Sequence, residues 1–180
     1  MKKYLRCHMV EAQPMTRGAF SKKQGRPLPY DADSKEKGYL VKYPDGYVSW
    51  CPKEAFEKQG LALEDGTKIT QQDLVEFKSL GCCRVGTKTA PDGKPYTMVE
   101  MVYPTGFTAF GTATCVDPKN YSEEIGGEIC AKKLDDALWG YLGFMLSWAK
   151  DGLSDKALEV ARREDAEAAA RAPTTKKGGK

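Results

Sequence analysis

The sequence predicts an α+β protein: a small β-rich N-terminal domain, a linker helix, and an antiparallel β-meander packed on one long or broken helix. Two Pro-Asp-Gly turns, which start at Pro44 and Pro91, each separate two runs of alternating apolar and polar residues. An apolar stripe at helical spacing follows the second of these regions. Hydrophobic residues make up 41% and charged residues 29% of the 180 residues, as is ordinary for a globular protein.

The first predicted domain covers residues 1–63. Alternation over residues 4–13 predicts a strand, and Thr16 is expected to cap a short helix that reaches Phe20. Residues 24–37 are expected to form a loop. A hairpin is predicted over residues 38–50, because proline before Asp-Gly presets a turn and glycine accepts a positive φ. Pro52 suits the start of a short helix over residues 53–58, whose Phe56 would return to the sheet.

A linker helix is predicted within residues 64–81. Thr70 and Asp73 give it a polar cap and an acidic first turn, both of which favour a helix N-terminus. Gly81 can end it. Its apolar residues recur at helical spacing: Leu74, Val75, Phe77 and Leu80.

The second predicted domain covers residues 82–150 and opens with strands over residues 82–89, 96–103 and 107–115. On the middle strand, Glu100 marks one face as only partly buried. The opposite face carries Thr97, Val99, Met101 and Tyr103.

A helix is predicted from Ser122 to about Ala149. Gly126 and Gly127 indicate close packing, whereas Gly140 and Gly143 predict a kink or a break into two helices. The expected apolar stripe consists of Ile125, Ile129, Leu134, Leu138, Leu142 and Met145.

The remaining residues, 151–180, are predicted to form a polar tail. Ser154 is expected to start a helix over residues 155–172, which has few large apolar residues and little reason to dock. Residues 174–180 are expected to be disordered.

No recognisable catalytic or metal-binding motif is present, so we expect a protein that acts by binding and has no catalytic, cofactor or metal residues. The six cysteines include no zinc-type pair, and without a signal peptide we expect free thiols. His8 is the only histidine and lacks an orienting partner in the local sequence. Glu123, Glu124 and Glu128 could hold Mg²⁺ on one helix face, but acids at a helix start usually complement its dipole.

Charge is unevenly distributed along the chain. Residues 1–40 have a net charge of +5, residues 41–149 of −4 and residues 150–180 of +2. The basic ends could contact nucleic acid, or they could simply keep flexible ends solvated.

Aromatic residues lie near these basic residues in the first domain. Such a surface could stack bases, although small β-rich domains also need large aromatics for a core. The predicted partner-binding residues are Lys22, Lys23, Arg26, Lys35, Lys37, Tyr39 and Tyr47, together with Glu123 and Glu124.

The run from Cys115 to Tyr121 (CVDPKNY) and the helix start from Glu123 to Gly126 (EEIG) carry a resemblance. Together with residues 137–142, these motifs are the basis of a resemblance over residues 83–146 to a family of accessory proteins encoded in tailed-phage genomes. Gly127 departs from that pattern, since these proteins usually have a basic residue there. Residues 11–17 and 38–50 resemble a module fused to phage accessory domains. The resemblance implies a phage or prophage origin but no activity and no catalytic residues.

The leading hypothesis is a non-enzymatic counter-defence protein that acts by stoichiometric binding, most concretely an anti-CRISPR that inhibits a guide-loaded Cas9-type nuclease. Residues 1–40 would contact guide RNA or DNA, and the acidic middle would face the positive channel of the nuclease. The alternatives are an oligomeric protein that sequesters a nucleotide immune signal, and a direct nucleic-acid binder. We expect no membrane association and a location in the cytoplasm of the host bacterial cell.

Overall fold

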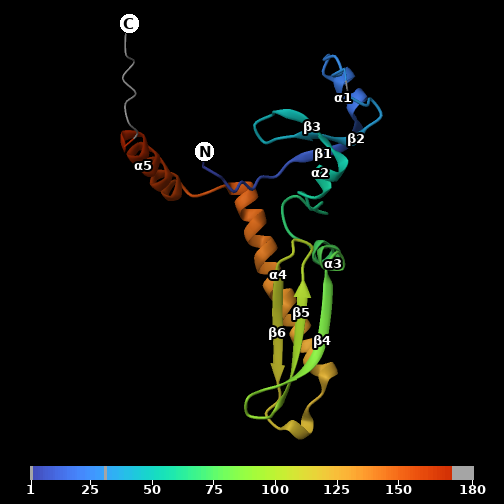
Figure 1. Cartoon of the computed structure of the whole chain (residues 1–180), viewed down its shortest axis with the longest axis vertical. Coiled ribbons are helices and arrows are strands. Elements are labelled where there is room, and N and C mark those ends of the chain that lie inside the picture. Colours follow the sequence, from blue (N-terminus) through green and yellow to red (C-terminus); the bar gives the residue numbers. More distant parts are fainter. Residues whose placement is uncertain (1, 31, 172–180) are drawn as a thin grey trace.

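The computed structural model describes residues 2–30 and 32–171 and confirms the α+β class. Two three-stranded antiparallel sheets lie at opposite ends of an elongated molecule (Figure 1). The first half contains β1 (Glu11–Thr16), α1 (Arg17–Lys23), β2 (Lys37–Lys42), β3 (Val48–Pro52) and α2 (Lys53–Glu57). The second half contains α3 (Gln71–Ser79), β4 (Cys82–Thr89), β5 (Pro95–Val102), β6 (Thr108–Thr114), the 3-10 turn η1 (Pro118–Asn120), α4 (Glu123–Asp151) and α5 (Asp155–Arg171).

The predicted hairpin is confirmed as strands β2 and β3 of the first sheet, whose order is β1-β2-β3. Gly46 takes a φ of 84° in its turn, and the Tyr43 amide donates to the Tyr47 carbonyl at 2.8 Å. Phe56 of α2 returns to the sheet as predicted, where its ring stacks on that of Tyr39 at a centroid distance of 4.5 Å.

The strand predicted over residues 4–13 is wrong for its first part, because pairing begins only at Glu11. Glu11 lies opposite Lys42, the last residue of β2, and the chain then turns away, so residues 4–10 have no partner strand. They run instead to the end of α4. There the Met9 amide donates to the Ala149 carbonyl at 3.3 Å, and the Cys7 thiol to the Met145 carbonyl at 3.6 Å.

Thr16 caps α1 as predicted, since its hydroxyl accepts from the Ala19 amide at 3.3 Å. The helix extends past the predicted end to Lys23. Beside it, the Trp50 indole donates to the Met15 carbonyl at 2.9 Å, and the Arg17 guanidinium lies 5.4 Å from the centre of the Trp50 ring. The first contact joins β3 to β1, and the second fixes the start of α1 against the first sheet.

The predicted helix after Thr70 is confirmed as α3, and it starts with a reciprocal cap. The Thr70 hydroxyl accepts from the Asp73 amide at 3.2 Å, while the Asp73 carboxylate accepts from the Thr70 amide at 2.7 Å. The same carboxylate accepts from the Glu64 amide at 2.9 Å, which ties the preceding loop to the helix. Of the expected apolar residues, Leu74 is buried, whereas Val75 and Leu80 are exposed.

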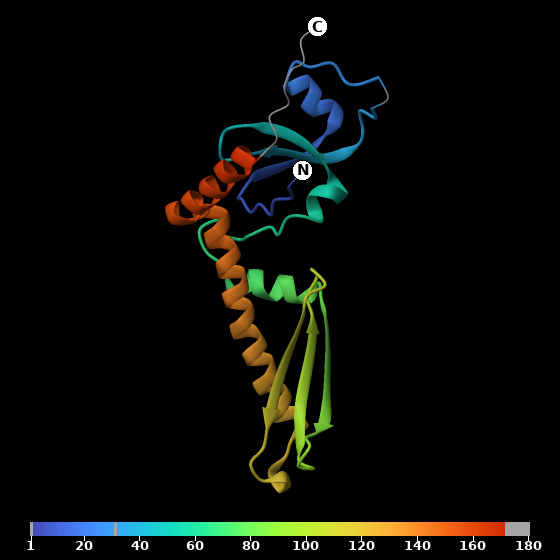
Figure 2. The ribbon, with the colours of Figure 1, turned by 60° about the vertical axis from the view of Figure 1, so that its left-hand side comes forward.

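The predicted meander is confirmed as a sheet in the order β4-β5-β6, with α4 covering one face (Figure 2). The predicted faces of β5 are also confirmed, because Glu100 lies on the half-buried side. The opposite face of this strand forms the core with α4 and consists of Thr97, Val99, Met101 and Tyr103.

Of the two predicted forms, one long helix or a broken one, the long helix is confirmed: α4 runs through Gly140 and Gly143 as one uninterrupted helix of 29 residues. Both glycines face open space, and the buried Leu138 and Leu142 hold the helix on the sheet around them.

The expected apolar stripe of α4 is wrong at Ile125, Ile129 and Met145, whose side chains are exposed. Small residues replace the two isoleucines in the row that faces the sheet. A residue four positions on lies on the same helix face, and this row is Gly126, Cys130, Leu134, Leu138 and Leu142.

Helix α5 begins after Ser154 as predicted, and the Ser154 hydroxyl accepts from the Ala157 amide at 3.4 Å. Lys2 forms an ion pair with Asp165 of this helix at 2.7 Å. The end predicted at Ala172 and the disorder predicted for residues 174–180 lie outside the described residues. All six cysteines are free thiols. Within the described ranges, no helix has the length and apolar character to cross a membrane.

Candidate functional site

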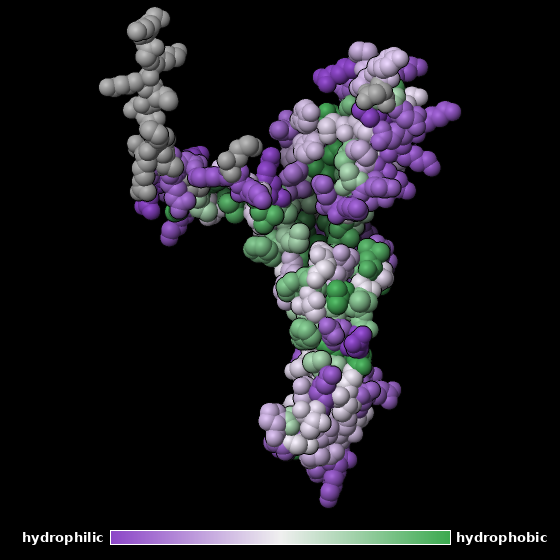
Figure 3. All heavy atoms as spheres, in the orientation of Figure 1, coloured by the Kyte–Doolittle hydropathy of each residue, from purple (hydrophilic) through white to green (hydrophobic). Residues whose placement is uncertain are grey.

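The five predicted cationic residues all lie exposed in the N-terminal half. Lys22 and Lys23 end α1, Arg26 and Lys35 lie in the following loop, and Lys37 begins β2. Because Thr16 pairs with Lys37, α1 and the loop that follows it leave and rejoin the first sheet at the same end, and all five cations lie in these segments or at Lys37 itself. Hydrophilic side chains dominate this part of the visible surface (Figure 3).

The two predicted aromatic residues do not join these cations in one stacking surface. The Tyr39 ring packs on Phe56, and its hydroxyl donates to Glu57 at 2.9 Å. That hydrogen bond, with burial second, raises the pKa of Tyr39. Tyr47 is exposed beside Tyr43 at the hairpin turn, which is the opposite end of β2 from Lys37.

Glu123 and Glu124 lie in the first turn of α4, at the far end of the molecule from the cations (Figure 1). The Thr87 hydroxyl donates to Glu123. Among residues 2–30 and 32–171, no group of three or more His, Cys, Asp or Glu side chains could hold a metal ion. The structure therefore does not bring the two sets of predicted partner-binding residues together.

The motif around Tyr121 has a structural explanation. The Tyr121 hydroxyl lies 2.8 Å from the Thr87 hydroxyl and 2.9 Å from that of Thr97, so it links β4 and β5 to the start of α4. Asp117 caps η1 by accepting from the Lys119 amide at 3.0 Å, and Ser122 caps α4. These residues fix where α4 begins.

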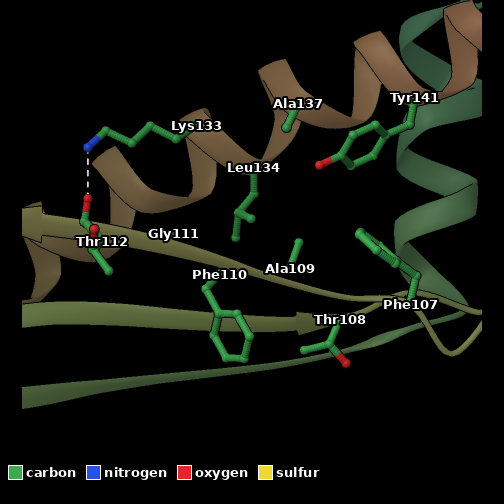
Figure 4. A pocket seen from close by; sticks show the side chains of 10 residues that line it. All are labelled: Phe107, Thr108, Ala109, Phe110, Gly111, Thr112, Lys133, Leu134, Ala137 and Tyr141. Carbon is green, nitrogen blue, oxygen red and sulfur yellow. Dashed lines mark hydrogen bonds between the residues drawn. The ribbon is translucent and has the colours of Figure 1, made fainter.

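Two depressions lie along the seam between β6 and α4. One of about 380 Å³ is lined by residues 107–112 of β6 and its turn and by Lys133, Leu134, Ala137 and Tyr141 of α4. The other, of about 150 Å³, continues along the seam beside Ala113, Ile125 and Ile129. Lys133 lies at their junction, where its ammonium donates to the Thr112 carbonyl at 2.7 Å (Figure 4). We call these two depressions together the β6–α4 groove.

Exposed aromatic residues lie at the wider end of this groove and next to it on α4. Phe107 and Tyr141 meet edge to face at a centroid distance of 5.8 Å, while the Phe110 ring points away from α4 (Figure 4). Phe144 is 67% exposed and lies 6.1 Å from the Trp148 ring. We call Phe107, Tyr141 and Phe144 the aromatic rim, whereas Phe110 lies on the opposite face of the sheet.

Buried packing holds the frame of the groove in place. Phe107 stacks on Tyr103 at a centroid distance of 6.4 Å, and the Tyr103 hydroxyl donates to the Leu134 carbonyl at 3.5 Å. Burial raises the pKa of Tyr103, which therefore stays a neutral donor. The groove is thus a preformed surface whose lining combines apolar side chains, polar uncharged side chains and one cation.

Sequence reasoning missed this groove, although two signals mark it. Small residues alternate on the face of β6 that meets α4, at Ala109, Gly111 and Ala113. On α4, a lone lysine interrupts a row spaced four residues apart: Ile125, Ile129, Lys133, Ala137 and Tyr141.

Comparisons with known proteins bear on the part of the chain that contains the groove. Residues 61–149 match the family described as "Phage protein (N4 Gp49/phage Sf6 gene 66) family". No curated protein and no solved structure matched the chain. From residue 61 to residue 149, the chain is similar to this family of phage proteins, and the match supports a phage accessory protein.

Proposed function

We propose that the chain is a phage accessory protein that acts stoichiometrically by binding a partner protein through the β6–α4 groove and its aromatic rim. The observation that carries this proposal is the cluster of exposed rings at one end of an open groove. Clustered apolar side chains on a surface mark interaction sites, and aromatic residues supply much of the energy of protein interfaces.

The most concrete version is counter-defence in the cytoplasm of the host bacterial cell, by inhibition of a guide-loaded Cas9-type nuclease. The uneven distribution of charge along the chain supports this version. The cations around α1 suit the phosphates of guide RNA or DNA, and residues 41–149, with a net charge of −4, suit a positively charged channel.

A cleavage assay with the guide-loaded nuclease tests this version. Cleavage is expected to stop when the chain reaches the concentration of the nuclease. Phe144→Ala should weaken binding roughly 30-fold, as truncation of a central aromatic residue does at an interface. Leu153→Ala is the matched control, since Leu153 is an exposed apolar residue that lies outside the groove, its rim and residues 1–40. No binding at micromolar concentration would end the Cas9 version.

Direct nucleic-acid binding is the second candidate function, because five exposed cations lie in α1, in the loop that follows it and at Lys37. Its affinity should fall steeply with salt concentration. Replacing Lys22 and Lys23 by alanine should weaken binding equally for all sequences and lower the salt slope by about two. A salt-independent affinity would contradict this candidate.

A further inference from the structure

We propose that the β6 edge accepts an extended acidic segment of a partner protein as a fourth strand, whose side chains pack over the β6–α4 groove. This inference rests on the proposed binding function and narrows the class of partner. Strand addition of this kind gains affinity from main-chain hydrogen bonds and specificity from alternate side chains.

The backbone of β6 is arranged to receive such a strand. β6 is an edge of its sheet, and the Tyr103 amide donates to the Phe107 carbonyl at 2.9 Å where β5 and β6 meet. In an antiparallel pair, alternate residues bond to the partner strand and the others point outward. The outward backbone groups are therefore those of Thr108, Phe110, Thr112 and Thr114, and the bond from Lys133 to the Thr112 carbonyl agrees with this alternation.

The side-chain spacing of α4 fits an added strand. α4 lies along β6, as shown by the Lys133–Thr112 bond and by the contact of Phe107 with Tyr141 (Figure 4). Residues four apart on a helix recur about every 6 Å along its axis. Side chains on one face of a strand recur about every 6.7 Å. Consecutive side chains of the added strand would therefore meet Ile129, Lys133 and Ala137 in turn.

Charge selects the occupant. Among the described residues that line the groove, Lys133 carries the only charge. Its ammonium donates to the Thr112 carbonyl, and an added strand would need the same carbonyl as an acceptor for its own main-chain hydrogen bond. A carboxylate on that strand would draw the ammonium away and free this carbonyl. The preferred segment therefore has an acidic residue with an apolar residue two positions to either side.

The same lysine argues against a second copy of the chain as the occupant. Antiparallel pairing of two β6 edges about Thr112 would bring two Lys133 ammonium groups together at the symmetry axis. Like charges held close in a partly desolvated interface oppose association.

A peptide titration of the full chain, followed by two-dimensional NMR of its backbone amides, tests this inference. The probe is a seven-residue peptide, the length of β6, with the sequence Thr-Val-Thr-Glu-Thr-Val-Thr. Amide shifts are expected along β6 and in the facing part of α4. The same peptide with lysine in place of glutamate should bind roughly tenfold more weakly.

Two variants make the test specific. Lys133→Glu should reverse the preference and favour the lysine peptide. Thr112→Pro should abolish binding, because proline removes an outward amide that β5 does not use. Thr89→Pro is the matched control: it removes an outward amide from β4, at the opposite edge of the same sheet, and should leave binding unchanged.

The contrary outcomes separate this inference from the proposed function. Absence of shifts at β6 at millimolar peptide, or equal binding by Lys133→Glu, would overturn strand addition. If the chain still inhibits the nuclease, only the strand-addition model fails. If the glutamate peptide binds as described and the nuclease is unaffected, strand addition stands and the Cas9 version fails.

Discussion

Gly126 of α4 lies so close to Thr97 of β5 that a β-carbon added to the glycine would lie 2.1 Å from the threonine hydroxyl oxygen. Thr97 is fully buried, and its hydroxyl is held by Tyr121. The close contact between α4 and its sheet therefore depends on the absence of one methyl group.

Gly126→Ala should lower the free energy of unfolding by about 1–3 kcal/mol, because overpacking outweighs the better helix propensity of alanine. Gly140→Ala is the matched control: nothing approaches Gly140, so alanine there should raise stability by about 0.5–1 kcal/mol. Urea unfolding followed by circular dichroism measures both changes. Equal effects at the two positions would contradict the packing described here.

Leu138→Ala should cost about 2–5 kcal/mol of unfolding free energy, since Leu138 is only 1% exposed and its removal leaves a cavity. Ile125→Ala should change stability by less than about 1 kcal/mol, because the Ile125 side chain is 59% exposed. Thermal and urea unfolding of the two variants report this contrast. A large loss of unfolding free energy for Ile125→Ala would indicate that Ile125 packs in the core, as the apolar periodicity of the sequence predicts.

Asp73→Asn should make the stability of the protein depend less on pH in the acid range. Burial alone would raise the pKa of Asp73, but hydrogen bonds from Glu64 and Thr70 outweigh it and lower the pKa below its ordinary 3.8. The stabilisation by charged Asp73 is therefore complete above pH 3.8 and is lost as the pH falls through the lowered folded pKa.

Melting temperatures measured from neutral pH to below 3.8 check this prediction. The wild-type chain should lose more stability than Asp73→Asn over the acid range. At neutral pH the variant should be less stable by about 1 kcal/mol, because the reciprocal cap is weakened. Parallel curves for the two proteins would refute the assigned role of the carboxylate.

Lys78 and Asp135 form an ion pair between α3 and α4, and both side chains are about 30% exposed. A double-mutant cycle with Lys78→Met and Asp135→Asn should give a coupling free energy of about 0.5–1 kcal/mol. This coupling should shrink at high salt. Lys94→Met and Asp92→Asn, a more exposed pair in the turn between β4 and β5, supply the comparison and should couple less.

Local chemistry made most elements predictable from the sequence. Thr70 with Asp73 specifies the start of α3, and Gly46 and Gly93 specify two turns, because each signal acts within a few residues. Residues 4–10 show the limit of such signals. Their alternation matches a strand, but β2 ends opposite Glu11, so no backbone remains to pair with them.

The candidate site was less predictable, because it depends on which side of α4 meets the sheet. Hydrophobicity favoured Ile125 and Ile129 for the core over Gly126 and Cys130. Gly126 and Cys130 face the sheet instead, because α4 approaches Thr97 and Gly111 too closely for larger side chains. Ile125 and Ile129 therefore lie beside the groove. Only the pairing of two distant elements reveals that choice.

The bonds from Met9 to Ala149 and from Cys7 to Met145 join residues 138 or more positions apart. A ribosome makes residues 2–10 before α4, yet these residues bind to the last part of α4 to be synthesised. The β2–β3 hairpin can fold while the chain is still being synthesised. Residues 2–10 can dock only after translation has passed residue 149. Docking of this segment is thus a late step that closes a loop of 138 or more residues.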